Sequence, residues 1–367
     1  MKGFSLQLKP VGSACNIACE YCYVAPFRPK HLTVMSDEVL SRVLSGCITG
    51  SEYPVITWHG GEPTLAGYDF FARAIELMEQ FRRPSQEVWN VLQTNATLIS
   101  PRFAELLSNA KFEVSISLDG PQHVHNLHRI DRRGRPTFAQ VSKGIETLRS
   151  AGFNPAVIAT VTQSSLPFPT ETLHFLVENG FRDIKYSPVY DSATDRFSIT
   201  SNQWFGYLKA VFLAWIELAD ADIHIRELDE VIAWLDGSSL SLCSSDQTCL
   251  NWVSVDPDGN LYPCEYLRTC HSYGNIMEMC LADIILTPTY QAFRQATLAT
   301  NDQCSNCRFQ QWCGNGCPAT RITPSGQIAA SGVYVYCRER QKLYNLVKTT
   351  FAQVLGDPTL QKGGTKV

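Results

Sequence analysis

The first half of the chain alternates between short apolar runs and longer segments in which apolar residues recur at helical spacing. The short runs predict six strands: Phe4–Leu8, Val55–Trp58, Val88–Leu92, Val114–Leu118, Pro155–Val161 and Ile184–Pro188. Helical patterns separate these runs, and Ser36 and Ser100 are placed to cap two of the predicted helices. Strands that alternate with helices predict an α/β fold built on a parallel sheet.

The pattern changes after about Thr200. Two helices are predicted over 204–219 and 227–234, and a terminal helix over 338–355. Beyond Cys243 the predicted elements are short and rich in cysteine, and we expect this segment to lack a core of its own and to be organised around metal. The predicted divisions are a barrel domain over 1–225, a linker over 226–242, a cysteine-rich domain over 243–340, and a helix and tail over 341–367.

Composition narrows the class of protein. The 367 residues are 44% hydrophobic and 18% charged, which is typical of a globular soluble protein. A net charge of −4 gives no electrostatic argument for nucleic acid or a membrane surface as a partner, and no signal peptide or membrane span is visible. Fourteen cysteines without an export signal indicate iron–sulfur ligands in a reducing compartment, the cytoplasm, rather than disulfides.

The loop after the first predicted strand contains Cys15-x3-Cys19-x2-Cys22. Three thiolates can hold three irons of a [4Fe–4S] cluster and leave the fourth iron open to a ligand. A zinc loop is the alternative, but zinc sites usually pair two Cys-x2-Cys motifs and no partner lies nearby. With an aromatic residue on each side of Cys22, the motif resembles the radical S-adenosylmethionine (SAM) superfamily. The resemblance implies SAM on the open iron and a partial, TIM-like (β/α)6 barrel.

Polar motifs follow the next three predicted strands, where ligands bind in parallel α/β folds. By the same resemblance, Gly60, Gly61, Glu62 and Pro63 bind the SAM amino group. The segments that contain Asn95 and Ser117 are similar to those of anaerobic sulfatase-maturing enzymes, as is the one that contains Arg129. This similarity places Asn95 near the cofactor and implies that Ser117 and Arg129 contact the SAM carboxylate and ribose. Asp119 is either a turn former or a polar site residue.

The cysteines of the C-terminal segment follow the order Cys249-x9-Gly259-x4-Cys264, Cys304-x2-Cys307-x5-Cys313-x3-Cys317 and Cys337, with Cys243 upstream. This order resembles the SPASM domain, which holds auxiliary clusters in peptide-modifying radical SAM enzymes. The family pattern implies one auxiliary [4Fe–4S] cluster on Cys243, Cys249, Cys264 and Cys317, and a second on Cys304, Cys307, Cys313 and Cys337. The total is then three clusters, with two zinc sites as the alternative at the C-terminal cysteines. Cys47 is expected in the core, and Cys270 and Cys280 have no assignment.

These resemblances imply an oxidoreductase that receives electrons from a donor such as flavodoxin or ferredoxin and takes a hydrogen atom from a peptide or protein. Sulfatase maturases carry an aspartate directly after the cysteine that matches Cys264, whereas this chain has Glu265, which is longer by one methylene. We therefore expect a maturase that crosslinks a ribosomally made precursor peptide, in a cyclophane or similar C–C bond, with Glu265 as a base. Glu265 is otherwise a solvated or supporting side chain. Formylglycine formation is the alternative activity, and a non-catalytic iron–sulfur relay or scaffold would need no SAM site.

Overall fold

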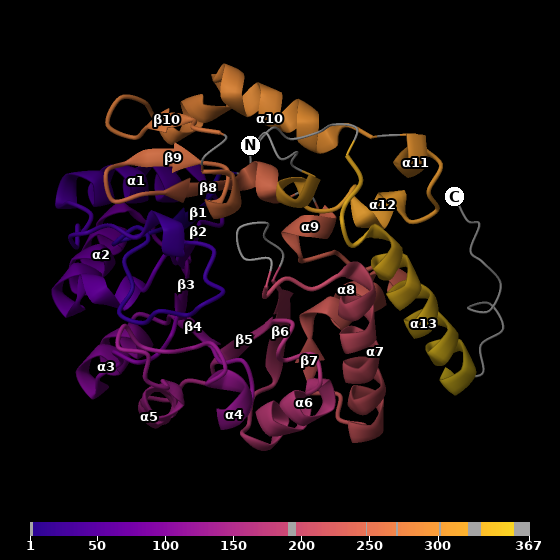
Figure 1. Cartoon of the computed structure of the whole chain (residues 1–367). Helices are drawn as coiled ribbons and strands as arrows, with labels where there is room; N and C mark the ends of the chain where they lie inside the picture. Colours follow the sequence, from indigo (N-terminus) through magenta and orange to yellow (C-terminus); the bar gives the residue numbers. More distant parts are fainter. Residues whose placement is uncertain are drawn as a thin grey trace.

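One ten-stranded sheet extends through both halves of the chain (Figure 1). The computed structural model describes residues 3–189, 196–246, 248–268, 271–300, 302–321 and 332–355. Six strands lie side by side in chain order and pair in parallel: β1 Ser5–Leu8, β2 Val55–Trp58, β3 Trp89–Thr94, β4 Glu113–Ser117, β5 Ala156–Val161 and β6 Asp183–Pro188. The six predicted strands and the α/β class are confirmed. Within the described residues the strand order is linear, so the barrel is partial.

Helices connect these strands and pack their apolar faces on the sheet. The helices are α1 Asp37–Gly50, α2 Tyr68–Phe81, α3 Pro101–Asn109, α4 Gln122–His125, α5 Phe138–Ser150, α6 Pro169–Glu178 and α7 Ser201–Leu218. The two predicted caps are present, since Ser36 accepts from the Val39 N–H at 3.3 Å and Ser100 accepts from the Phe103 N–H at 3.2 Å. Buried residues alternate with more exposed ones along β2. In β2, Ile56 and Trp58 are fully buried in the core.

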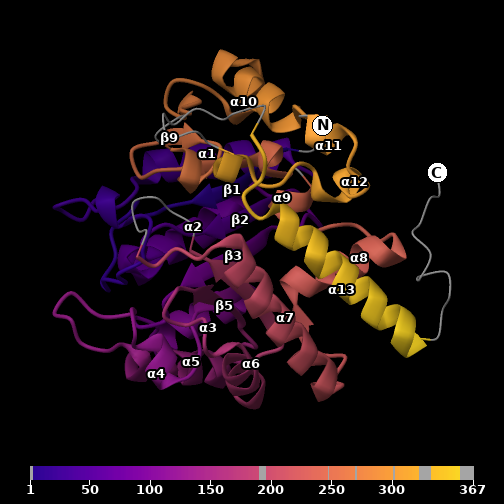
Figure 2. The same ribbon diagram turned by 45° about the vertical axis from the view of Figure 1, so that its right-hand side comes forward.

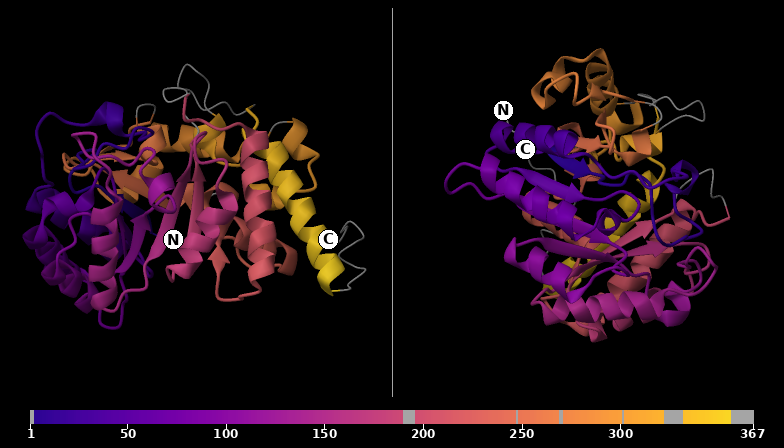
Figure 3. Two further views of the ribbon diagram at one scale, coloured as in Figure 1. Left: turned by 60° about the horizontal axis from the view of Figure 1, so that its bottom comes forward. Right: turned by 90° about the vertical axis from the view of Figure 1, so that its left-hand side faces the viewer.

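The cysteine-rich segment continues the sheet instead of forming a separate unit. Strand β8 (Trp252–Val255) pairs in parallel with β1, and β9 (Asn260–Tyr262) and β10 (Gly274–Asn275) follow it outward. Figure 3 shows this segment beside the N-terminal strands and α1. Val253, Val255 and Phe293 are fully buried and belong to the same core cluster as the barrel, so the segment shares the core of the barrel.

Several smaller elements complete the described chain. They are β7 His224–Ile225, α8 Arg226–Asp236, α9 Cys243–Asp246, α10 Pro288–Leu298, α11 Asp302–Ser305, α12 Gln310–Cys313 and α13 Cys337–Leu355. Helix α8 occupies most of the range expected as a linker, and it buries Leu228 and Val231 completely. Helix α13 packs along α7 (Figure 2). None of the helices in the described part of the chain combines the length and apolar character needed to cross a bilayer.

Candidate active site

The three-cysteine loop begins directly after β1, at the carboxyl ends of the parallel strands. Cys15 and Cys19 are buried and Cys22 is half-buried. Burial raises the pKa of the Cys15 thiol to about 12, with further increases from Glu62 and from the other two cysteines. Burial also raises the pKa of Cys19 to about 11, although Arg129 opposes that shift. These thiols are therefore protonated near neutral pH until a metal displaces the protons.

The paired glycines after β2 allow this loop to lie against the cysteine loop. The Gly61 N–H donates to the Gly12 carbonyl at 2.8 Å, and the Glu62 N–H donates to the Ala14 carbonyl at 2.8 Å. A Cβ on Gly61 would lie 2.0 Å from the Ala14 oxygen, and Gly60 has a φ of +111° that favours glycine. The close approach that requires glycine is thus made to the backbone that presents Cys15.

Glu62 connects this loop to the end of β3. Its Oε1 accepts hydrogen bonds from the Thr64 N–H at 3.1 Å, the Thr64 hydroxyl at 2.6 Å and the Thr94 hydroxyl at 2.8 Å. Its Oε2 accepts from the Asn95 N–H at 2.7 Å. Burial raises the pKa of this carboxyl group, which is only 1% exposed. Protein donors therefore occupy both oxygens of Glu62, and its contact with the SAM amino group remains a prediction.

The polar residues predicted at the next strand ends lie beside the cysteine loop. The Asn95 side-chain amide donates to Asn16 Oδ1 at 2.9 Å and to Cys15 Sγ at 3.8 Å. Ser117 accepts from the Gln93 side chain at 3.0 Å, on the neighbouring strand. Pro63 begins a short 3-10 helix, Pro63–Ala66, that fixes the end of the glycine loop. The structure thus gathers the predicted cofactor-binding residues at one edge of the sheet.

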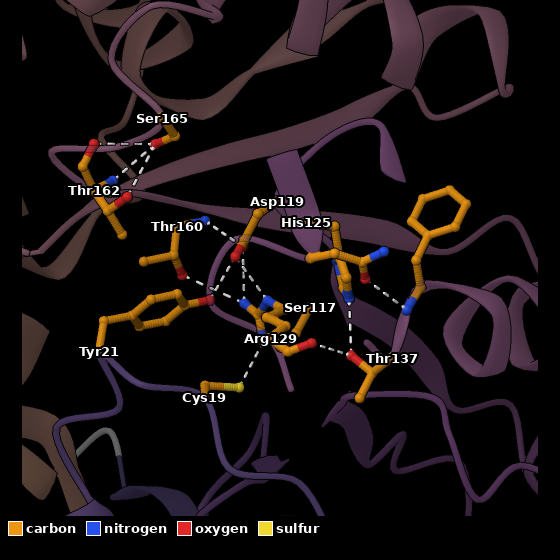
Figure 4. A network of polar contacts seen from close by, with 12 residues as sticks. Cys19, Tyr21, Ser117, Asp119, His125, Arg129, Thr137, Thr160, Thr162 and Ser165 are labelled. Atoms are coloured by element: carbon orange, nitrogen blue, oxygen red, sulfur yellow. Dashed lines mark hydrogen bonds and ion pairs between the residues drawn. The ribbon is translucent and has the colours of Figure 1, made fainter. Parts of the chain in front are cut away.

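Asp119 and Arg129 form a buried ion pair behind Cys19 (Figure 4). Arg129 donates from Nε to Asp119 Oδ2 and from Nη2 to Oδ1, both at 2.9 Å. Tyr21, which precedes the third cysteine, donates its hydroxyl to Asp119 Oδ2 at 2.6 Å. Asp119 therefore lies in a buried polar network beside the cysteine loop, and its role at the site stays a prediction. Sequence reasoning missed the contact with Tyr21, because only the fold brings these loops together.

The first auxiliary group of cysteines also converges in space. Burial raises the pKa of Cys264, and the next contributions come from Cys317, Cys243 and Cys249. Such mutual electrostatic effects require short separations. These cysteines lie in α9, in the 3-10 segment Thr248–Asn251, two residues after β9, and directly before the 3-10 helix Pro318–Arg321. They are the four that the SPASM resemblance groups together.

The second auxiliary group lines a cavity between α11, α12 and α13. Its walls include Cys304, Cys307, Cys313 and Cys337. Gln341 donates to Cys307 Sγ and Cys337 Sγ, both at 3.6 Å, and Arg340 donates to Cys313 Sγ at 3.5 Å. A cavity with four thiols and surrounding N–H donors fits an iron–sulfur cluster. In the described ranges no three His, Cys, Asp or Glu side chains converge on a point where one metal ion would sit.

The other cysteines lie apart from these groups. Cys47 is 1% exposed and its thiol donates to the Phe4 carbonyl at 3.4 Å, which confirms the expected core position. Cys280 is exposed at the start of the 3-10 helix Leu281–Leu286, and Cys270 lies outside the described residues.

Glu265 lies in a buried ionic cluster of four residues, Lys9, Asp256, Glu265 and Arg268, that joins the two halves of the chain. The Lys9 ammonium, at the end of β1, contacts Glu265 Oε2 and lies 2.5 Å from Asp256 Oδ1. Arg268 contacts Glu265 Oε1 at 3.0 Å and Asp256 Oδ2 at 2.8 Å. Cationic donors therefore contact both oxygens of Glu265, and its expected role as a base stays a prediction.

Arg268 extends this ionic cluster to the cysteine loop. Its Nη1 also donates to the Ser13 hydroxyl at 2.9 Å, two residues before Cys15. Glu265 and Arg268 therefore help to connect Cys264 to the cysteine loop, and Tyr266 also stacks on Tyr23 of that loop with ring centroids 4.4 Å apart. Lys9 belongs to no recognisable sequence motif, so its place in this ionic cluster could not be predicted from the sequence.

Models of known protein families match segments in both halves of the chain. Residues 10–178 match the radical SAM superfamily, and residues 243–308 match SPASM, an iron–sulfur cluster-binding domain. The chain carries a radical SAM domain and a SPASM domain. This radical SAM protein is therefore an oxidoreductase-type enzyme that uses SAM and iron–sulfur clusters.

Curated relatives share nearly the full length of this radical SAM enzyme. The cysteine-type anaerobic sulfatase-maturating enzyme of Clostridium perfringens is 28% identical over 357 residues, covering 94% of this chain and 96% of the relative. The serine-type enzyme of Bacteroides thetaiotaomicron is 27% identical over 372 residues, covering 91% of this chain and 89% of the relative.

Solved structures are also similar to this chain over most of its length. Native anSMEcpe with bound AdoMet and Cp18Cys peptide aligns with a TM-score of 0.86 and 28% identity, covering 97% of this chain and 99% of that one. Streptococcus suis SuiB bound to its precursor peptide SuiA aligns with a TM-score of 0.66 and 17% identity, covering 91% of this chain and 75% of that one. The similarity to SuiB shows a shared fold only.

Proposed function

We propose that this protein is a maturase that oxidises the Cβ of a cysteine or serine in a sulfatase-type polypeptide to formylglycine. The observation that supports it best is the likeness over both domains to anSMEcpe with bound AdoMet and peptide. Relatives of the cysteine type and of the serine type match this chain about equally well, so the proposal includes both target residues. The crosslinking activity expected from Glu265 has no support in these comparisons.

The three groups of cysteines suit three [4Fe–4S] clusters. Cys15, Cys19 and Cys22 would hold the SAM-binding cluster, and the two sets of four C-terminal cysteines would hold the auxiliary clusters. When bound, SAM and its cluster supply a 5′-deoxyadenosyl radical for hydrogen abstraction, and the auxiliary clusters supply acceptors for the second electron. A flavodoxin- or ferredoxin-type protein would be the external donor of electrons.

The residues of this chain would position these groups. Gly60 and Gly61 hold the glycine loop against the cysteine loop, and Glu62 fixes that loop to the end of β3 through two hydrogen bonds, from the Thr94 hydroxyl and the Asn95 N–H. Glu265 would act as a positioning residue, because its contacts with Lys9 and Arg268 fix the backbone next to Cys264. The base that takes the second proton from the substrate would then be another group.

The test is a product assay under anoxic conditions. The reconstituted, reduced enzyme is incubated with SAM and with sulfatase peptides that differ only in a cysteine or a serine at the target position. We expect 5′-deoxyadenosine and a peptide aldehyde, which a hydrazide reagent captures. The serine peptide should lose two hydrogens, and the cysteine peptide should also exchange sulfur for oxygen. Cys15→Ala should abolish both products, whereas the matched control Cys47→Ala, in the core, should retain them.

Three outcomes would contradict the proposal. Formation of 5′-deoxyadenosine with both peptides left free of aldehyde would exclude formylglycine formation. A peptide that loses two hydrogens without reacting with hydrazide would instead indicate a crosslink. Absence of SAM cleavage in protein that contains all its iron would support the non-catalytic alternative.

A further inference from the structure

All three nitrogens of the Arg129 side chain contact protein groups, and one of these groups is the sulfur of a predicted cluster ligand. Its Nε and Nη2 bind Asp119, while Nη1 donates to Cys19 Sγ at 3.8 Å. Nη2 also reaches the Thr160 hydroxyl at 3.4 Å. Figure 4 shows the guanidinium between the carboxylate and the sulfur. The expected contact of Arg129 with SAM stays a prediction, and the contact with Cys19 is a separate feature of the same guanidinium.

The contact lies in a dry environment. Arg129 is 6% exposed, Asp119 is 5% exposed, and Cys19 is 8% exposed. Electrostatic interactions are stronger where water is excluded, so a cation at this distance acts on the sulfur with little screening. Asp119 partly offsets the positive charge, and it is itself held by Tyr21 and by the Thr160 N–H at 2.8 Å.

Hydrogen bonds and charges around the ligand sulfurs set the reduction potential of an iron–sulfur cluster. Reduction adds one negative charge to the cluster, so a donor with positive charge stabilises the reduced form and raises the potential. The carboxylate of Asp119 works in the opposite direction. The two members of one ion pair should therefore shift the same potential with opposite signs.

We propose that the Asp119–Arg129 pair sets the reduction potential of the SAM-binding cluster through the Arg129 contact with Cys19. Arg129 favours the reduced cluster, and Asp119 limits that effect and fixes the guanidinium in place. The inference depends on Cys19 as a cluster ligand and not on the peptide substrate. It therefore stands or fails independently of formylglycine formation.

The test is a potentiometric titration of the holoenzyme monitored by electron paramagnetic resonance. The relevant cluster is the one whose spectrum changes when SAM is added. In Arg129→Met the ratio of reduced to oxidised cluster at a fixed potential should fall about tenfold, which is about 59 mV for one electron. In Asp119→Asn the ratio should rise, and Arg129→Lys should recover part of the loss.

Arg132→Met provides a matched control. Arg132 is exposed and donates to the backbone carbonyl of Cys15, at 3.1 Å from Nε, so it also approaches the cysteine loop without touching a sulfur. Its removal should leave the potential unchanged. If Arg129→Met fails to assemble the cluster, Asp119→Asn and Arg129→Lys still decide the question.

Equal potentials in Asp119→Asn and the wild type would overturn the proposal. So would shifts of the same sign in Arg129→Met and Asp119→Asn, because general disruption of the pocket would produce that result.

Discussion

Replacing Lys9 with methionine should destabilise the protein by disrupting the ionic cluster between its two halves. Lys9 is 0% exposed, and its ammonium contacts Asp256 and Glu265, whose side chains are 6% and 2% exposed. Methionine keeps most of the apolar stem but leaves two buried carboxylates with one cation. Removing one partner of a buried ion pair costs about 3–5 kcal/mol. Because Arg268 still contacts both carboxylates, we expect a loss near the lower end, about 3 kcal/mol.

The assay is urea unfolding under anoxic conditions, followed by circular dichroism. Lys9→Met should unfold at a lower urea concentration than the wild type. The double variant Lys9→Met/Glu265→Gln should recover part of the difference, because it removes one charge of each sign. Arg82→Met is a matched control, since Arg82 pairs with Glu79 at 2.7 Å on the surface, where a salt bridge contributes at most about 1 kcal/mol.

The iron content of the same variants separates positioning from overall stability. Displacement of the backbone next to Cys264 should lower the occupancy of the first auxiliary cluster in Lys9→Met more than that of the second auxiliary cluster, whose cysteines lie outside the ionic cluster. If Lys9→Met has the same urea midpoint and iron content as the wild type, the ionic cluster neither stabilises the protein nor positions Cys264.

Three further predictions follow from particular contacts. Gly61→Ala should reduce the rate of 5′-deoxyadenosine formation at least tenfold and destabilise the loop by about 1–3 kcal/mol, because the new Cβ would lie 2.0 Å from the Ala14 oxygen. The control Gly50→Ala places its Cβ in open space and should have little effect on that rate. Cys304→Ala should remove about four of about twelve irons while SAM cleavage persists, as measured by iron analysis and by the yield of 5′-deoxyadenosine. His125 is fully buried, and burial first and Arg129 second lower its pKa to about 3. As pH falls from about 6.5 to about 3, the unfolded chain binds a proton that the folded chain does not, so stability should fall by roughly 4 kcal/mol over that window, and acid unfolding of His125→Gln should lack this contribution.

The barrel was predictable because its elements are encoded locally. Apolar runs such as Val55–Trp58 and caps such as Ser36 depend on neighbours in the sequence, and they appear in the structure at those positions. The cysteine groups were predictable from spacing and family resemblance. Strand β8 was not predicted, because only its pairing with β1 makes Trp252–Val255 a strand.

The contacts between distant segments could not be predicted in the same way. Glu265 was identified from its position after Cys264, but its ion pair is with Lys9, which lies 256 residues earlier in the chain. Arg129 was assigned to SAM by resemblance, which stays a prediction, and its contacts with Asp119 and Cys19 could not be read from the sequence. Sequence spacing identified these residues as candidates, and only the packing of loops determined their partners.

The most direct test of the proposed activity follows a hydrogen atom. A sulfatase peptide deuterated at the Cβ of its target cysteine or serine is incubated with the reduced enzyme and SAM. Formylglycine formation predicts that deuterium appears in 5′-deoxyadenosine in proportion to the aldehyde formed in the peptide. Unlabelled 5′-deoxyadenosine together with an unchanged peptide would contradict the account.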